Sequence, residues 1–211
     1  MELAELTVRG FTEEIASASP APGGGSAAAL AGAVGAALTA MVSGLTLGRK
    51  KYEAVQELAL RVQAQADALR KRLLAAMEQD TQAFLQVSAA YAMPKQTPEE
   101  KQARSSAIEQ GLKACTQPPL AVMQLCAEGL ELLESLLGKT NATAASDFGV
   151  ACLSLRAGMQ GAWLNVCINT GSLHDAAFAA GARAAGQKLL DTGLPRADRC
   201  YAAMLAVCSE G

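Results

Sequence analysis

One aspartate, Asp80, stands where a helix of a soluble protein normally carries an apolar side chain. Between Tyr52 and Tyr91, apolar residues recur at steps of three and four, and Asp80 falls on that face between Ala76 and Phe84. A carboxylate on such a face costs several kcal/mol unless it is paired or hydrogen-bonded. Asp80 is therefore either held by a neighbouring helix or used as an acid or base, and the second is the sharper hypothesis.

A second candidate is the run Gly23, Gly24 and Gly25, which follows two closely spaced prolines and precedes Ser26. Glycine has no Cβ to keep a ligand away, and Ser26 is the expected N-cap of an Ala-rich helix. A glycine run at a helix N-terminus presents free N–H groups that suit a carboxylate, a phosphate or a developing negative charge. A flexible turn before a buried helix fits the spacing equally well. No Gly-Lys-Ser/Thr follows, so the run is not a nucleotide P-loop.

Further polar residues occur late in the chain. Ser146 and Asp147 lie near the predicted start of a helix, where Asp147 is either a first-turn acid or part of a site. Asn165 and Asn169 are one turn apart on the same helix and share a face. Two amides on an otherwise apolar helix indicate a polar partner, either another helix or a heteroaromatic ligand.

The turn Gly48-Arg49-Lys50-Lys51 is basic and follows the predicted Ala-rich helix. Cations at a helix C-terminus complement its dipole, which favours a solvated structural role. The alternative is that Lys50 or Arg49 pairs with an anionic ligand.

The composition excludes several functional classes. The chain has 211 residues, a net charge of −2 and 4% aromatic residues, so it carries no basic footprint for nucleic acid. Residues 27–47 carry no charge and are long enough to raise the question of a membrane span. The segment is mostly Ala and Gly, so we expect a buried helix and no membrane partner.

The six cysteines form no Cys-x-x-Cys pair and lie within helical patterns, as small core residues do. Scattered free thiols predict a reducing, cytoplasmic location. With a single histidine, His174, no familiar zinc spacing is present, and we expect a protein without a metal site.

These patterns predict an all-α fold in one domain, residues 1–211, with about seven or eight helices. A buried Ala/Gly-rich helix from Ala27 to Leu47 forms the centre, because small residues recur every four positions along it and let neighbours approach closely. A long helix from Tyr52 to Tyr91 follows. Breaks are expected at Pro94, at Pro118-Pro119, at Gly138 and near Gly193. After the first break, Thr97 and Glu100 are predicted to form a capping box that starts the next helix.

Several stretches together resemble the formiminotransferase-cyclodeaminase C-terminal family, which includes formiminotetrahydrofolate cyclodeaminases and methenyltetrahydrofolate cyclohydrolases. They are Pro-Ala-Pro-Gly-Gly-Gly-Ser with its Ala-rich continuation, Leu-Thr-Leu-Gly-Arg-Lys-Lys-Tyr, Asp80-x-x-Ala-Phe, Met-Pro-Lys, Ser-Asp-Phe-Gly-Val, and Asn-Val-x-Ile-Asn ending at Asn169. The resemblance extends over nearly the whole chain.

The resemblance implies a tetrahydrofolate derivative as substrate, polyglutamylated or not, and no cofactor beyond it. The leading expectation is cyclodeamination of 5-formiminotetrahydrofolate to 5,10-methenyltetrahydrofolate with release of ammonia. The alternatives are hydrolysis of methenyltetrahydrofolate to 10-formyltetrahydrofolate and a non-catalytic folate-binding or assembly subunit. A homodimer is also expected, because one chain carries more apolar helix surface than it can cover.

The resemblance and the chemistry together assign roles to these residues. Asp80 is the leading acid or base, and Asp147 is its partner or an anchor for the pterin ring. Lys50 is expected to meet the glutamate carboxylates of the folate. The remaining binding candidates are the glycine run with Ser26, Ser146, Asn165 and Asn169.

Overall fold

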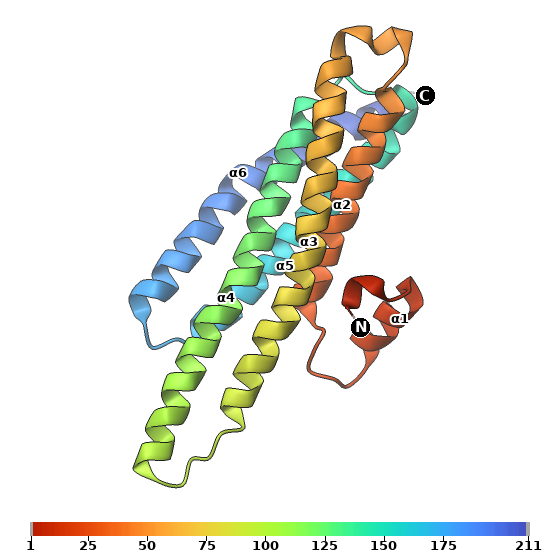
Figure 1. Cartoon of the computed structure of the whole chain (residues 1–211). Coiled ribbons are helices and arrows are strands. Elements are labelled where there is room, and N and C mark those ends of the chain that lie inside the picture. Colours follow the sequence, from red (N-terminus) through yellow and green to blue (C-terminus); the bar gives the residue numbers. More distant parts are fainter. Residues whose placement is uncertain (1, 210–211) are drawn as a thin grey trace.

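The structure, a computed structural model, describes residues 2–209, and within them it contains six α-helices, three short 3-10 helices and no strand. The α-helices are α1 (Val8–Ala16), α2 (Gly24–Thr46), α3 (Gln56–Tyr91), α4 (Pro98–Ser135), α5 (Ala145–Gly171) and α6 (Ala176–Ser209). The 3-10 helices are η1 (Leu3–Glu5), η2 (Lys50–Val55) and η3 (Ala142–Ala144). Figure 1 shows the long helices α2 to α5 running side by side. The all-α prediction is confirmed.

The helices number fewer than predicted because two expected breaks do not occur. α4 continues through Pro118 and Pro119, although Pro119 lacks the N–H that would bond to the carbonyl of Cys115. That carbonyl instead accepts the side-chain Nδ2 of Asn169 at 2.8 Å. The carbonyl freed by Pro118 belongs to Ala114, which is exposed, so water can reach it. The two carbonyls that lose their helical partner therefore bond to a side chain of another helix or can bond to water.

α6 likewise continues through Gly193, which was expected to separate two helices. A Cβ at Gly193 would lie 2.6 Å from the Met159 side chain of α5. The glycine is therefore required for close packing between helices and does not end one.

The central helix is α2, which packs on α3, α4 and α5 and begins three residues before the predicted Ala27. A Cβ at Gly158 of α5 would lie 2.9 Å from both the Ala28 carbonyl and the Gly32 nitrogen of α2. The two helices therefore touch backbone to backbone. They run antiparallel, since Gly24 lies beside Asn165 and the Thr46 hydroxyl accepts the Asn141 N–H at 3.1 Å.

The predicted buried Ala/Gly-rich central helix is confirmed, although one apolar stripe of α2 remains open. Val34 is 45% exposed, Met41 40% and Leu45 39%. Among the described residues, α2 is the one helix long and apolar enough to cross a membrane by length and composition, and the core helix of a soluble protein passes the same test. Half of its most apolar stretch is buried inside the bundle.

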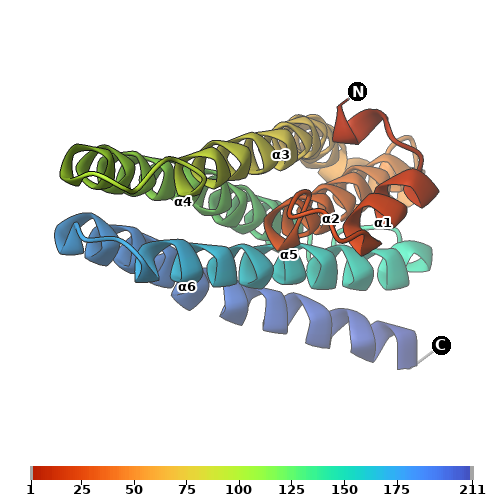
Figure 2. The same ribbon diagram turned by 90° about the horizontal axis from the view of Figure 1, so that it is seen from below.

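The core lies between α2, α3, α4 and α5, with α6 covering α4 and α5 on the far side (Figure 2). Its largest fully buried side chains include Leu73, Met77, Met123, Phe148, Leu155 and Met159. The α3–α4 hairpin extends past the N-terminal end of α2 (Figure 1), and its second helix begins with the predicted capping box of Thr97 and Glu100. This extension places the middle of α3 and of α4 beside the start of α2.

Candidate active site

A cavity of about 140 Å³ opens where the start of α2 meets α3, α4 and α5. It is lined by Pro20, Ala21, Gly23, Gly24, Gly25, Asp80, Thr81, Phe84, Cys115, Asn165 and Asn169. Six of the residues singled out from the sequence therefore share one cavity, although they come from three separate parts of the chain.

Asp80 reaches from α3 to the first turn of α2. The Ser26 hydroxyl donates to Asp80 Oδ2 at 3.0 Å and also lies 3.1 Å from the Thr81 hydroxyl. Burial raises the pKa of Asp80, while the Ser26 hydroxyl and the Ser26 backbone N–H act in the opposite direction. The net shift is upward, so the carboxylate is harder to keep ionised than one in water.

The N-terminal end of α2 differs from the prediction. The N-cap is Gly23, and Ser26 is buried in the first turn of the helix, where its hydroxyl holds Asp80. Asp80 therefore supplies the negative charge that the N-terminus of α2 attracts. Ser26 is wrongly predicted as the N-cap because a serine after glycines fits that position equally well in sequence.

Gly25 leaves the space that the carboxylate occupies. A Cβ at this position would lie 2.3 Å from Asp80 Oδ1 and 2.5 Å from Oδ2, far inside van der Waals contact. Only glycine at position 25 lets Asp80 approach the helix so closely.

Asn165 and Asn169 form the opposite wall of the cavity. Asn165 Nδ2 donates to the Gly161 carbonyl at 3.0 Å, and Asn169 Nδ2 donates to the Cys115 carbonyl at 2.8 Å. Each side chain is thereby fixed in orientation. The two amide oxygens remain as acceptors for a donor group in the cavity.

Sequence reasoning missed Pro20, Ala21, Thr81, Phe84 and Cys115 as lining residues. Thr81 and Phe84 follow Asp80 on the same helix, so their proximity to it was a usable signal. Cys115 had none, because it looks like the other buried cysteines of the helical core. Burial, with the nearby Asp80 charge, raises the pKa of its thiol to about 11, so it is a neutral thiol at physiological pH.

Lys50, Ser146 and Asp147 do not lie at this cavity. Lys50 begins η2 after the C-terminal end of α2, and Ser146 and Asp147 are in the first turn of α5. Asp147 lies 18 residues before Asn165 on α5, which is about 27 Å along the helix, and Lys50 follows the far end of the 23-residue α2, about 34 Å from its start. Asp147 therefore cannot be the partner of Asp80 within one chain.

The end of the bundle that holds Lys50 and Asp147 is organised around the start of α5. The Tyr52 hydroxyl accepts the Ala142 N–H at 3.3 Å, which ties η2 to η3. The N-cap of α5 is Ala144, which provides no side-chain hydrogen bond. Lys50 is exposed, and Asp147 is half-buried.

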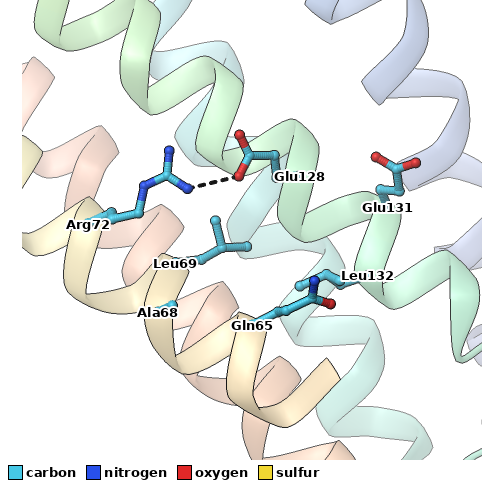
Figure 3. Close-up of a pocket in the computed structure, with 7 residues that line it drawn as sticks. All are labelled: Gln65, Ala68, Leu69, Arg72, Glu128, Glu131 and Leu132. Carbon is cyan, nitrogen blue, oxygen red and sulfur yellow. Dashed lines mark hydrogen bonds and ion pairs between the residues drawn. The ribbon is translucent and has the colours of Figure 1, made fainter. Parts of the chain in front are cut away.

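A larger hollow, about 350 Å³, lies between α3 and α4 and contains none of the predicted site residues. Figure 3 shows its polar groups, of which Arg72 Nη1 and Glu128 Oε2 form an ion pair at 3.0 Å. Within residues 2–209, no three His, Cys, Asp or Glu side chains are placed to hold a metal ion.

Comparison with known proteins gives a consistent result. Residues 7–188 match the family described as Formiminotransferase-cyclodeaminase. The chain is 44% identical to the methenyltetrahydrofolate cyclohydrolase of Methylorubrum extorquens, over 82% of this chain and 83% of that one. It is 34% identical to the formimidoyltransferase-cyclodeaminase of Mus musculus, over 83% of this chain and 32% of the longer protein.

The fold also matches a solved structure. The crystal structure of a formiminotetrahydrofolate cyclodeaminase from Thermotoga maritima superposes with a TM-score of 0.81 and 26% identity, over 98% of this chain and 97% of that one.

Proposed function

This chain belongs to the formiminotransferase-cyclodeaminase family of folate one-carbon enzymes, and we propose that it is a methenyltetrahydrofolate cyclohydrolase. The observation that favours this reaction is the extent of the similarity. The cyclohydrolase relative matches over four fifths of both chains, whereas this chain spans about a third of the length of the murine bifunctional relative. The order of the two enzymatic alternatives drawn from the sequence is thereby reversed.

The reaction requires three proton transfers. Water adds to the methenyl carbon between N5 and N10, and the water must lose a proton as the C–O bond forms. As the C–N5 bond breaks, N5 gains a proton and the new hydroxyl loses its proton to form the formyl C=O, which gives 10-formyltetrahydrofolate and one net proton. Neither step changes an oxidation state, so we propose that no redox cofactor is needed.

Asp80 is the group in the cavity suited to the first transfer. Its raised pKa makes it a stronger base than an ordinary carboxylate, closer to the pH at which the reaction runs. Ser26 holds one carboxylate oxygen in place. The same carboxyl, once protonated, can return the proton to N5.

The wall formed by Asn165 and Asn169 is suited to bind the pterin ring of the substrate. The 2-amino group and the N3–H of a pterin are donors, and the oxygens of Asn165 and Asn169 are acceptors whose orientation is fixed. The cavity volume of about 140 Å³ is below the range of sites for drug-sized ligands, which begins near about 300 Å³. We infer that the cavity holds the reacting ring and that the benzoylglutamate portion lies outside it.

Cyclodeamination is the second candidate, because a cyclodeaminase has this fold over the whole chain. In this reaction N10 loses a proton as it attacks the formimino carbon, and the leaving nitrogen gains two protons and departs as ammonia. The cavity as described serves either reaction.

The deciding experiment offers the protein 5,10-methenyltetrahydrofolate and 5-formiminotetrahydrofolate separately and follows the methenyl absorbance. We expect the absorbance to decay faster than the uncatalysed rate with the first compound and not to rise with the second. A rise with the second compound and no accelerated decay with the first would establish the cyclodeaminase instead. Binding of either compound without turnover would identify a non-catalytic folate-binding subunit.

A further inference from the structure

Thr81, which follows Asp80 on α3, differs from the buried helical threonines in how its hydroxyl is bonded. A threonine within a helix commonly donates to the carbonyl four residues earlier. Four buried threonines do so here: Thr39, Thr46, Thr116 and Thr170. The Thr81 hydroxyl instead lies 3.1 Å from the Ser26 hydroxyl of α2, and within residues 2–209 it bonds to no carbonyl. It is therefore bonded to the residue that holds Asp80 and not to its own helix.

The Ser26 hydroxyl has one proton and three oxygen neighbours. They are Asp80 Oδ2 at 3.0 Å, the Thr81 hydroxyl at 3.1 Å and, as the most distant of the three, the Met77 carbonyl at 3.4 Å. A carbonyl and an ionised carboxylate can only accept a hydrogen bond, whereas a hydroxyl can donate or accept. When Asp80 is ionised, Thr81 is thus the one neighbour of the three that can donate to Ser26.

The charge of Asp80 decides the direction of these hydrogen bonds. A hydrogen bond to an ionised carboxylate is about twice as strong as one between neutral groups, so the Ser26 proton points at Asp80 and the Thr81 proton points at Ser26. A hydroxyl that receives a hydrogen bond becomes a better donor, by about 10–30% per bond. Thr81 therefore strengthens the bond between Ser26 and Asp80, although neighbouring residues of a helix do not face each other.

The same hydrogen bonds leave the two oxygens of Asp80 in different surroundings. Ser26 is fully buried and covers Oδ2, while Oδ1 receives no side-chain hydrogen bond within residues 2–209. Asp80 and Thr81 both line the cavity. Among the cavity residues from α2, α4 and α5, the one titratable side chain is Cys115, whose pKa of about 11 keeps it neutral. Asp80 is therefore the charged group that these hydroxyls act on.

We propose that Thr81 is a positioning residue, whose hydroxyl donates to Ser26 and so keeps Asp80 Oδ2 bonded and Oδ1 free to exchange protons with the substrate. Thr81 acts through Ser26 and needs no contact with the substrate. The two hydroxyl bonds stay the same when Oδ1 gains or loses a proton, so the site is preorganised for both steps. The part of this proposal that concerns turnover rests on the proposed function.

The pH profile of kcat/KM tests this role. Thr81→Val replaces the hydroxyl by a methyl group, and the weaker Ser26 bond should raise the pKa of Asp80, because the Ser26 hydroxyl lowers it. The acidic limb should move to higher pH, so that kcat/KM on the acidic side falls about threefold. Thr81→Ala also removes the hydroxyl and should give the same change, whereas Thr81→Ser should restore the parent limb.

Thr39→Val is the matched control for Thr81→Val. The Thr39 hydroxyl donates to the Gly35 carbonyl of its own helix, so its loss should leave the acidic limb in place. Parent-like limbs in both Thr81→Val and Thr81→Ala, or a limb that Thr81→Ser does not restore, would contradict the positioning role.

The same substitution in a Ser26→Ala background shows whether Thr81 acts through Ser26. With no hydroxyl at position 26, Thr81→Val should move the limb no further than Ser26→Ala alone. A further move of the limb would show that Thr81 acts on Asp80 directly. A rise in KM of equal size in both backgrounds would show that it contacts the substrate. Either result would overturn the proposal.

A final measurement does not depend on turnover, so it distinguishes failure of this role from failure of the proposed function. The aspartate carboxyl groups are labelled with ¹³C and titrated by NMR, and the Asp80 signal is assigned by its absence in Asp80→Asn. Its midpoint should lie at higher pH in Thr81→Val than in the parent and should return to the parent value in Thr81→Ser. This result would support the role of Thr81 even if the protein turns over neither folate. Equal midpoints in the parent and Thr81→Val would overturn it, even in an active cyclohydrolase.

Discussion

Each end of the α2–α5 pair carries candidate site residues predicted from the sequence, but the two ends differ in how these residues are held. At one end, Asp80 is half-buried, held by Ser26, and shares a cavity with glycines and two amides of fixed orientation. At the other, Lys50 is exposed and Asp147 is half-buried. Within one chain, the first end raises the pKa of the Asp80 carboxyl group, whereas the Lys50 side chain at the second end is open to a ligand or a partner.

The enclosed end also lowers stability, as expected for a functional site. Because the pKa of Asp80 is raised in the folded state, the native chain binds a proton more readily than the unfolded chain just above the ordinary value of 3.8. The free energy of unfolding contributed by this group therefore falls as pH rises through the interval between that value and the raised pKa. Above it, an ionised Asp80 is a net cost to folding.

Gly25→Ala should produce the largest loss among the neighbours of Asp80. The new Cβ would meet the carboxylate at 2.3 Å, which forces it out of position. We expect turnover to fall on the order of a hundredfold, as for a misplaced reacting group, and stability to fall by about 1–3 kcal/mol. Initial rates and a denaturant titration measure the two effects.

Gly181→Ala is the matched control for this substitution. Gly181 lies on α6, where an added Cβ has no neighbour within 4 Å, so the change should leave both quantities near those of the parent. If Gly25→Ala behaves like Gly181→Ala, the contact between Gly25 and Asp80 does not organise the site.

Asn169→Ala should have an intermediate effect, mainly on stability. It leaves the buried Cys115 carbonyl without a donor, because Pro119 cannot supply one, and this should cost about 1–3 kcal/mol. Asn165→Ala should cost under about 1 kcal/mol, because its Nδ2 bonds only to a carbonyl of its own helix.

A double-mutant cycle isolates the cause of the Asn169 effect. Pro119→Ala restores the backbone N–H, so Asn169→Ala should cost less in that background than in the parent. Equal costs in the two backgrounds, measured by denaturant unfolding, would show that Asn169 does not act through the Cys115 carbonyl.

Ser26→Ala should have the smallest effect and appear mainly in the pH profile. The Ser26 hydroxyl lowers the pKa of Asp80, so its loss should raise that pKa further and move the acidic limb of kcat/KM to higher pH. Ser43→Ala also removes a buried hydroxyl of α2, one bonded only to Thr39, and should leave the limb in place. An unmoved limb in Ser26→Ala would remove Asp80 from the titration that controls activity.

The fold was predictable where the signal is local. Thr97 and Glu100 form the expected capping box, and Gly138 adopts the positive φ expected of a helix stop. Pro118-Pro119 and Gly193 were wrongly predicted to end helices. Asn169 of α5 bonds the carbonyl that Pro119 leaves free, and Met159 of α5 packs against Gly193. A single sequence does not show such tertiary compensation.

The candidate site was also predictable only where single residues stand out in the sequence. Asp80 stood out because a carboxylate interrupts an apolar face, and the glycine run stood out by composition. Which candidates share a cavity depends on α2 and α5 running antiparallel, and this decides that Asn165 joins Asp80 while Asp147 does not. Helix periodicity gives the face of each residue and not the direction in which two helices pack.

The measurement that tests the central claim most directly is the hydrolysis rate of 5,10-methenyltetrahydrofolate by Asp80→Asn, with a melting curve of the same sample. Asparagine is nearly isosteric and can still accept the Ser26 hydroxyl, and it removes a charge that partial burial disfavours. The account predicts a melting temperature at neutral pH no lower than that of the parent, and a rate reduced about a hundredfold or more. A folded variant with close to the parent rate would show that Asp80 is not the acid or base. A variant that melts well below the parent would show that the Asp80 carboxylate chiefly stabilises the start of α2.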